Sequence, residues 1–439
     1  MMNRINAFTA IALFLLCSEF LLAQSTIKVL SVDEMFKLAA ENSKQLKLSN
    51  AGIATARTAT DVAKNSLLPS IGTSLSVSYI GDGFITDRNF SHLTNAPMPH
   101  FGNDFALEAS QVIYGGRTIS NQIEIAKLNE QIAQLSFNKE QLNVRFLLIG
   151  YYLELYKLMN QREVYIKNKE QINILIEQIK AKQKEGMALG SDITRHELML
   201  QNIEFALIEI DNNCKIINNQ LVTTLGLSDS TSIRPDTSIL SLDLIRREQN
   251  DLLKDALGNV PELKTADLNI QIADKNVNMA KANYLPSISL FAGDYFNGPI
   301  LIEVPPINKN YNYWTAGIGL KYNLSSLYAA KHTVSQAKAT QDLANSARDV
   351  IEEKTELAVK SALIKYNESF DHLKTIEKSY ALARQNYELI QNRYLNNMVL
   401  ITEMLDAGNS KLDAELKVVN ARINIIYNYY NLKYTSGTL

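Results

Sequence analysis

The chain has 439 residues, a formal net charge of −2 and 21% charged residues, and its Lys and Arg residues do not cluster. This balance argues against nucleic acid as a partner. After the first residues no stretch offers 18 uncharged apolar side chains, so the sequence excludes a membrane helix. Any part of the chain inside a membrane would have to be a barrel of strands.

Residues 1–23 contain one positive charge followed by short apolar runs and end at Ala23. This pattern predicts a secretory signal peptide that is removed in the mature protein. Cys17 raises the alternative of a lipoprotein, but Leu16 is bulky for the residue before a lipid-attachment site. Cleavage leaves only Cys214, so no intramolecular disulfide can form, and we expect this thiol to pack as a small apolar group on a helix.

Two copies of one unit follow the signal peptide. Residues 36–71 align with 253–288, and both segments end in Leu-Pro-Ser-Ile. Further along, 185–193 aligns with 396–404. We therefore predict a first repeat over 24–227, a linker or small side element over 228–250, and a second repeat over 251–439.

The residue pattern of each repeat predicts, in order, a helix, two strands joined by a long loop, a very long helix, a tight turn and a returning helix. The residue before a proline avoids the helical region, so the first helix of each repeat should end at Leu68 or Leu285. Beyond these residues the apolar period changes from 3.6 to 2, and one face becomes apolar while the other is rich in Ser and Gly. The predicted strands cover about 70–82, 103–114, 287–297 and 312–324. The third is the least regular, because Asp294 falls on its apolar face.

The long helices are predicted over 117–184 and 329–396, two runs of equal length without proline. Each would be roughly 100 Å long. Apolar residues recur at three- and four-residue steps among polar ones, which is typical of coiled-coil packing. Gly186 and Asn397 suit the left-handed cap of a helix. The chain should then return as helices over about 191–225 and 402–434.

Four strands cannot close a membrane barrel, and open sheet edges in lipid would leave backbone groups unpaired. Identical chains must therefore pool their strands. A dimer would supply eight strands and a trimer twelve. The interior of an eight-stranded barrel is filled by its own side chains, whereas a barrel of twelve strands leaves an opening. The small residues on the polar strand faces favour the trimer. The predicted fold class is an α+β membrane protein.

The mature chain resembles the TolC-like outer membrane factor family. The doubled Leu-Pro-Ser-Ile junction, the strand exit SQVIYGGR at 110–117 and the hairpin over 393–432 carry the resemblance. It implies a homotrimeric, 12-stranded β-barrel in the outer membrane that continues as a periplasmic α-helical barrel. It also implies an exit duct of a tripartite efflux pump or type I secretion system. The tunnel end would stay closed until a periplasmic adaptor protein and an inner-membrane transporter engage it.

No catalytic constellation, cofactor motif or metal-ligand spacing is present, and the scattered histidines are interpreted as surface residues. The histidines are His92, His100, His196, His332 and His372. We expect no enzyme activity and no cofactor. The alternative to a duct is a periplasmic coiled-coil scaffold or adaptor without a channel. The alternating apolar residues Trp314, Leu320 and Tyr322 favour the duct, because a scaffold needs no lipid-facing strand. The cargo, whether drugs, metal ions or proteins, is not encoded in a readable way.

Candidate functional residues lie near the predicted turns. Glu403 and Asp406 are three residues apart and so share a helix face, which on sequence alone favours a solvated surface. In the family resemblance, "TEMLDA" stands where two acidic residues ring the narrowest point of the tunnel. The resemblance therefore implies a pore constriction at Glu403 and Asp406.

The resemblance also implies polar links that hold the coils shut, at Tyr394, Ser191, Asp192 and Arg422; ordinary interface packing is the alternative for Tyr394 and Arg422. Relatives often place an arginine at the position of Val399. Without it, we expect the closed state of this chain to be held either more weakly or by other contacts. The turns also predict adaptor-docking tips with exposed apolar side chains, unless those side chains pack the tip itself. The tip residues are Gly186, Met187, Leu189, Asn397, Met398 and Leu400, with Val399 included among the exposed apolar ones.

Overall fold

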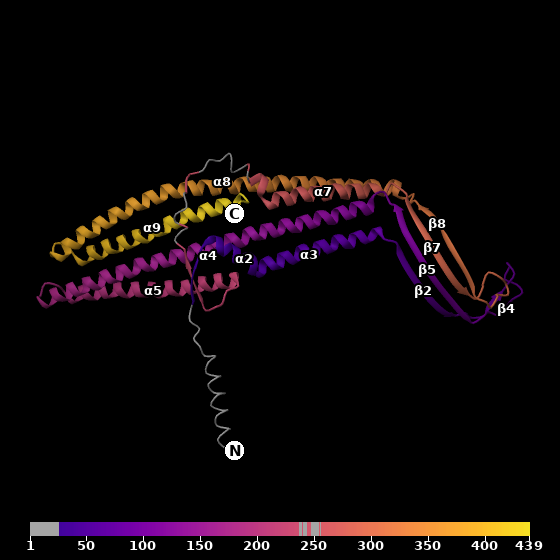
Figure 1. The fold of residues 1–439 in the computed structure, drawn as a ribbon, viewed down its shortest axis with the longest axis horizontal. Helices are drawn as coiled ribbons and strands as arrows, with labels where there is room; N and C mark the ends of the chain where they lie inside the picture. Colours follow the sequence, from indigo (N-terminus) through magenta and orange to yellow (C-terminus); the bar gives the residue numbers. More distant parts are fainter. Residues whose placement is uncertain (1–25, 237–238, 240–243, 247–253, 255) are drawn as a thin grey trace, which may run out of the picture. The chain divides into compact units, whose positions relative to one another are not determined.

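The computed structural model describes residues 26–236, 239, 244–246, 254 and 256–439 (Figure 1). The predicted signal peptide, Cys17 and part of the predicted linker lie outside these residues. The chain forms two compact units, and each draws segments from both sequence repeats. The sheet unit comprises Asn50–Ser136 and Glu262–Ile351; the helical unit comprises the segments up to Ser49, Phe137–Pro261 and Glu352–Leu439.

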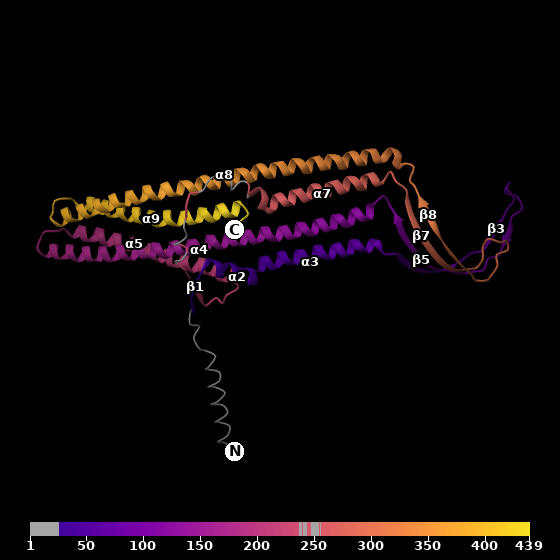
Figure 2. The same ribbon diagram turned by 45° about the horizontal axis from the view of Figure 1, so that its top comes forward.

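The sheet unit contains a four-stranded antiparallel sheet in the order β2-β5-β7-β8 (Figure 2). Its strands are β2 (Ser70–Tyr79), β5 (Phe101–Tyr114), β7 (Ser287–Gly298) and β8 (Tyr311–Lys321). The loop between β2 and β5 holds a small hairpin of β3 (Gly83–Ile85) and β4 (Thr94–Ala96). All four predicted strands are therefore present, with ends shifted by up to three residues.

The prolines end the helices before these strands as expected. Helix α3 (Lys44–Lys64) tightens into the short 3₁₀ turn η2 (Asn65–Leu67), and Leu68 then takes extended angles of φ −89° and ψ 151°. In the second repeat α7 (Pro261–Ala282) ends three residues before Leu285. The steric conflict between a proline ring and the preceding residue thus sets where helix changes to strand.

Two long helices follow the strand pairs, α4 (Thr118–Lys184) and α8 (Ser326–Leu395). They return as α5 (Gly190–Leu225) and α9 (Ile401–Thr435), so the helical unit contains two hairpins. Gly186 and Asn397 have φ of 74° and 61°, which confirms the predicted left-handed caps. Among the described residues, no helix combines the length and the hydropathy needed to cross a membrane.

The core of the helical unit lies where α4, α5 and α9 meet two short segments of the chain. Strand β1 (Thr26–Leu30) pairs in parallel with β6 (Thr231–Pro235), which lies in the predicted linker, and α2 (Val32–Asn42) follows β1. Tyr152 on α4 is fully buried here, and its hydroxyl donates to the Leu30 carbonyl at 2.8 Å. It also accepts the Asp236 N–H at 2.8 Å, so one side chain links both sides of the small sheet.

Candidate functional site

The four-stranded sheet has one apolar face and one polar face. The strand register places Leu75 of β2 opposite Phe105 of β5, and Leu290 of β7 opposite Ile318 of β8, all on one face. Apolar side chains of the two outer strands on this face are largely exposed, from 63% for Val77 to 79% for Tyr79. Within the described residues, the outer edges of β2 and β8 pair with no other strand.

The opposite face is polar and carries a short row of tyrosines. The Tyr295 hydroxyl donates to Glu108 Oε1 at 2.9 Å, and its ring stacks on Tyr313 with 5.0 Å between centroids. Tyr313 in turn stacks on Tyr311. Asp294 lies on the apolar face as the sequence indicated, where it accepts a hydrogen bond from the Asn312 side chain at 3.0 Å. Such a sheet suits an environment that is apolar on one side and wet on the other.

The two hairpin tips are built alike. In the first, the Met187 N–H donates to the Lys182 carbonyl at 2.9 Å, and in the second the Met398 N–H donates to the Arg393 carbonyl at 2.8 Å. Leu189 and Leu400, the residues before α5 and α9, are each 69% exposed. Because both turns have the same hydrogen bonds, they present the same pattern of side chains.

Four apolar tip residues are exposed as expected: Met187, Leu189, Met398 and Leu400. The expectation for Val399 was wrong, because Val399 is half-buried and packs with Ala188 against a buried cluster. This cluster consists of Leu175, Ile179, Tyr394 and Met404. The middle residue of each Met-X-Leu tip thus turns inward, and its neighbours turn outward.

Tyr394 joins the two hairpins by packing. It is 9% exposed, lies against Ile179 of α4 and Met404 of α9, and its ring centroid is 6.2 Å from that of His196 on α5. Burial, with a smaller effect of the Asp192 carboxylate, raises the pKa of Tyr394 to about 12, so the phenol stays protonated at neutral pH. The described hydrogen bonds of Tyr394 do not include one to Asp192.

Asp192 instead stabilises its own turn. Its carboxylate accepts the Leu189 N–H at 3.3 Å, and its carbonyl accepts from His196 Nδ1 at 2.9 Å. The interpretation of His196 as a surface residue was wrong, because its side chain packs at the tip and is only 1% exposed. This burial lowers the pKa of His196. Ser191 is exposed beside Asp192. Tyr394, Ser191 and Asp192 lie at the tips, whereas Arg422 pairs with Glu377 of α8 at 2.9 Å within its own hairpin and does not join them.

Glu403 and Asp406 are both exposed in the first two turns of α9. Neither makes a side-chain hydrogen bond or ion pair within the described part of the chain. Glu403 is the third residue of α9, the position that Asp192 occupies in α5. Two exposed carboxylates on one helix face have the charge needed to line a cation-favouring pore.

Two lysines that the sequence analysis missed link the hairpins. Lys182 Nζ donates to the carbonyl of Leu395, the last residue of α8, and to Asn397 Oδ1 at 3.3 Å. Lys411 of α9 is 8% exposed; its Nζ donates to Gln171 Oε1 of α4 at 2.7 Å and lies 4.6 Å from the Tyr387 ring centroid. Burial lowers the pKa of Lys411. The alignment of 185–193 with 396–404, extended by three residues toward the N-terminus, aligns Lys182 with Arg393, and this was the available signal for Lys182.

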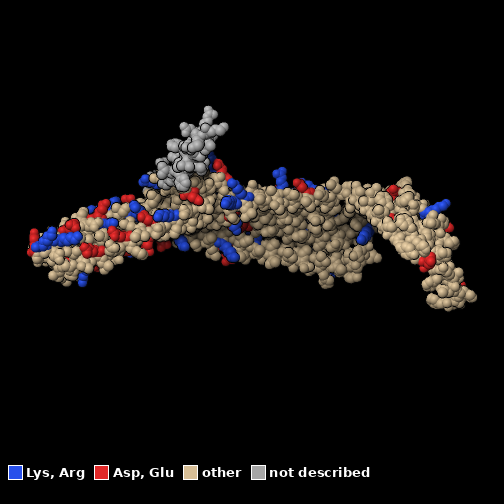
Figure 3. Space-filling model, turned by 90° about the horizontal axis from the view of Figure 1, so that it is seen from below, with Lys and Arg blue, Asp and Glu red and all other residues tan. Residues whose placement is uncertain are grey.

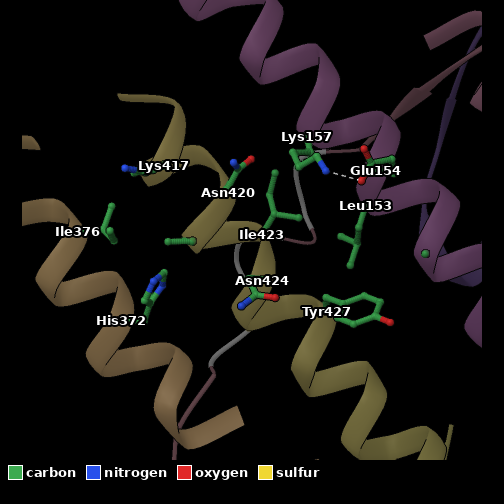
Figure 4. A pocket seen from close by; sticks show the side chains of 12 residues that line it. Leu153, Glu154, Lys157, His372, Ile376, Lys417, Asn420, Ile423, Asn424 and Tyr427 are labelled. Carbon is green, nitrogen blue, oxygen red and sulfur yellow. Dashed lines mark hydrogen bonds and ion pairs between the residues drawn. The ribbon is translucent and has the colours of Figure 1, made fainter. Parts of the chain in front are cut away.

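A groove of about 550 Å³ lies between α4, α8 and α9 (Figure 4). An ion pair between Lys157 and Glu154 at 2.5 Å lies on one wall, and His372 lies on the other. Within the described residues, no group of three or more His, Cys, Asp or Glu side chains could hold a metal ion. Charged side chains gather over the hairpins, whereas the visible face of the strands shows few (Figure 3).

Comparisons with known proteins agree with this architecture. The outer membrane efflux protein family matches residues 252–438. The outer membrane protein TolC of Vibrio cholerae is 22% identical over 415 residues, which cover 92% of this chain and 90% of that protein. TolC of Escherichia coli K12 is 22% identical over 227 residues, covering 47% of this chain and 44% of that protein.

Solved structures share the fold. The outer membrane protein VceC of Vibrio cholerae has a TM-score of 0.76 at 15% identity, covering 92% of this chain and 96% of that one. The outer-membrane channel OprN has a TM-score of 0.74 at 16% identity, covering 93% and 90% of the two chains. The sheet and the long hairpins therefore have the fold of outer-membrane channel proteins. The chain is similar to TolC-like outer membrane factors over nearly its whole length, and its location is the outer membrane, with its helical part in the periplasm.

Proposed function

We propose that three copies of the chain pool their sheets into one 12-stranded barrel that serves as an exit duct. The observation that carries this proposal is the sheet itself, which has one apolar face and two unpaired edges, β2 and β8. Unpaired backbone groups at such edges are costly in lipid. Because the chain supplies an even number of antiparallel strands, β8 of one copy runs antiparallel to β2 of the next, and the pattern closes without a break.

A barrel of three copies leaves more room for the polar face of the sheet, which would line the barrel interior, than a barrel of two copies. An eight-stranded barrel is filled by its own side chains. The polar face of this sheet carries serines and glycines on β2 and a row of tyrosines on β7 and β8. Twelve strands leave room for such side chains around an open, water-filled path. The duct is passive: a periplasmic adaptor and an inner-membrane transporter supply substrate and energy, in an efflux pump or a type I secretion system.

In this proposal, the end of the duct that is formed by the hairpin tips controls whether the duct is open or closed. In a homotrimer Glu403 and Asp406 provide three carboxylates each, one helical turn apart, and together they form the constriction. Rings of carboxylates favour cations. Tyr394 holds the hairpins shut by packing, Ser191 and Asp192 shape the turn beside it, and Arg422 stiffens the second hairpin through Glu377.

The exposed side chains of the tips are the docking surface for the adaptor. Met187, Leu189, Met398 and Leu400 project from turns whose shape depends on Gly186 and Asn397. Four exposed large apolar side chains in two matching turns suit an apolar partner segment. The turns themselves are held by their own hydrogen bonds and by the inward-facing Ala188 and Val399, so the exposed residues are free to bind.

The proposal is tested by export and conductance together. A strain lacking the gene should lose export of the cargo that its transporter handles, and purified protein should form ion-conducting pores in a planar bilayer. Recovery of the protein from the soluble periplasmic fraction, without pore activity, would instead indicate a scaffold.

A further inference from the structure

The polar face of the four-stranded sheet brings side chains from all four strands into one row. Ser76 of β2 lies opposite Asp104 of β5. On the other side of β5, Asp104 lies opposite Asn297 of β7, which in turn lies opposite Tyr311 of β8. Neighbouring strands are about 4.8 Å apart, so the row runs roughly 14 Å across the sheet.

A cavity of about 490 Å³ lies over this row, where β2 and β7 end, away from α3 and α7 (Figure 1). Ser76 and Asp104 line it from β2 and β5, and Tyr311 and Tyr313 line it from β8. A cavity of this volume has the size of a site for a small organic molecule.

The loop between β7 and β8 adds an apolar wall to the cavity. Pro299, Ile300, Leu301 and Ile302 all line it. Ile300 and Ile307 exchange two backbone hydrogen bonds of 3.0 Å, which fold this loop into a hairpin. Leu301 and Ile302 are nevertheless 48% and 93% exposed, so a bound molecule can cover them.

The tyrosines of the cavity are held in place by their neighbours on the sheet. Tyr313 stacks on both Tyr311 and Tyr295, with centroid distances of 5.3 Å and 5.0 Å. Tyr295 is fixed in turn, because its hydroxyl donates to Glu108 Oε1 at 2.9 Å. Gly293 leaves the space that Tyr295 occupies, since a Cβ at this glycine would lie 2.6 Å from the Tyr295 hydroxyl. The aromatic wall of the cavity is therefore preformed.

The cavity is also electronegative. Of the described residues that line it, Asp104 alone is charged; its side chain is exposed and forms no ion pair within the described part of the chain. Asn297, with its amide nitrogen turned toward β5, donates to Asp104 Oδ1 at 3.1 Å and leaves the charge in place. The faces of aromatic rings are negative as well. A carboxylate beside such rings favours a cation, because the attraction of a cation to the rings adds to the ion pair.

We propose that this cavity binds an organic cation with an apolar body. The cationic group lies between Asp104 and the tyrosine rings, and the body lies against Leu301 and Ile302. A metal ion would leave the apolar wall uncovered, whereas an anion or a neutral molecule would leave Asp104 without a partner charge. The placement of the site rests on the proposed function. Where the polar face lines a trimeric barrel, three such cavities surround the outer end of the duct, as sites separate from the proposed constriction.

Ligand-observed NMR titration tests the chemistry of the site. The probe is benzyltrimethylammonium, added to the purified protein in a Glu403→Ala/Asp406→Ala background so that the tip carboxylates do not contribute. Asp104→Asn should raise the dissociation constant about fivefold, the order of an exposed ion pair, and Tyr311→Leu about threefold. Tyr311→Phe keeps the ring and should bind as the parent does. Asp294→Asn is the matched control, because it removes a carboxylate from the apolar face of the same sheet, and it should leave the dissociation constant unchanged.

Three further probes test the specificity. Benzenesulfonate, which carries the opposite charge, and the neutral benzyl alcohol and maltose should each bind more weakly than the cation, by about fivefold or more. Equal binding of any of these probes, or an unchanged dissociation constant in Asp104→Asn, would overturn the inference alone. Native mass spectrometry establishes the oligomeric state of each sample. A monomer that still binds the cation through Asp104 would support the assigned ligand and overturn the proposed duct.

Cysteine labelling locates the site. In a Cys214→Ser background, Ser76→Cys should react with a membrane-impermeant maleimide added to intact cells, and benzyltrimethylammonium should slow this reaction. Leu75→Cys, on the opposite face of β2, should stay unlabelled because it faces lipid. If the probe does not slow labelling at residue 76, it does not occupy this cavity and the inference is overturned. If residue 75 is labelled as fast as residue 76, the apolar face does not lie in lipid, and the proposed barrel is overturned instead.

Discussion

Replacing Tyr394 separates packing from hydrogen bonding at the gate. The ring is 9% exposed and contacts Leu175, Ile179 and Met404, whereas no hydrogen bond of its hydroxyl to Asp192 is among its contacts. Tyr394→Phe keeps the ring and should change the closed state by less than about 1 kcal/mol. Tyr394→Ala removes the ring from a packed site, and such changes cost about 3–5 kcal/mol.

These energies predict clearly different channels. A loss of about 3 kcal/mol from the closed state corresponds to roughly a hundredfold change in the ratio of open to closed pores, since about 1.4 kcal/mol is tenfold. Single-channel recordings in a planar bilayer should therefore show Tyr394→Ala mostly open and Tyr394→Phe close to the wild type. Native mass spectrometry serves as the control that both variants remain assembled. If Tyr394→Phe opens the pore as far as Tyr394→Ala, the phenol hydroxyl holds the gate and packing does not.

Three further changes test other parts of the tips. Glu403→Ala with Asp406→Ala should abolish cation selectivity and block by trivalent cations while the trimer persists; retained selectivity would show that these carboxylates are only a solvated helix face. Leu189→Ser with Leu400→Ser should abolish export in cells without changing pore formation by the purified protein, and unchanged export would reject adaptor docking at these residues. His196 is buried with a lowered pKa, so the unfolded tip binds its proton more readily than the folded tip. The stability of the closed tip should therefore fall as pH drops below about 6.5, and His196→Gln should remove this part of the pH dependence of open probability; an identical pH profile would contradict it.

Local rules were sufficient to predict most of the elements. The doubled proline marked where helices become strands, and period-two alternation located all four strands of the sheet. Gly186 and Asn397 identified the turns, because few residues accept a left-handed conformation. These features depend on the conformational preferences of one residue and its neighbours along the chain.

Contacts between the hairpins could not be predicted from the sequence alone. Val399 follows an exposed methionine and precedes an exposed leucine, and only the packing of two turns shows that it faces inward. Lys182 and Lys411 look like ordinary surface lysines in a polar helix, yet both reach residues more than 200 positions away. The pairing of Arg422 with Glu377 likewise depends on how α8 and α9 lie together. Tertiary packing decided each of these positions, and no local pattern encodes it.

The central claim is that three chains pool their four-stranded sheets. Native mass spectrometry of the protein extracted from outer membranes in mild detergent measures this directly. The account predicts a single species with three times the mass of the mature chain, which dissociates only when the detergent or heat denatures it. A stable species with the mass of one chain, still conducting in a bilayer, would contradict the account.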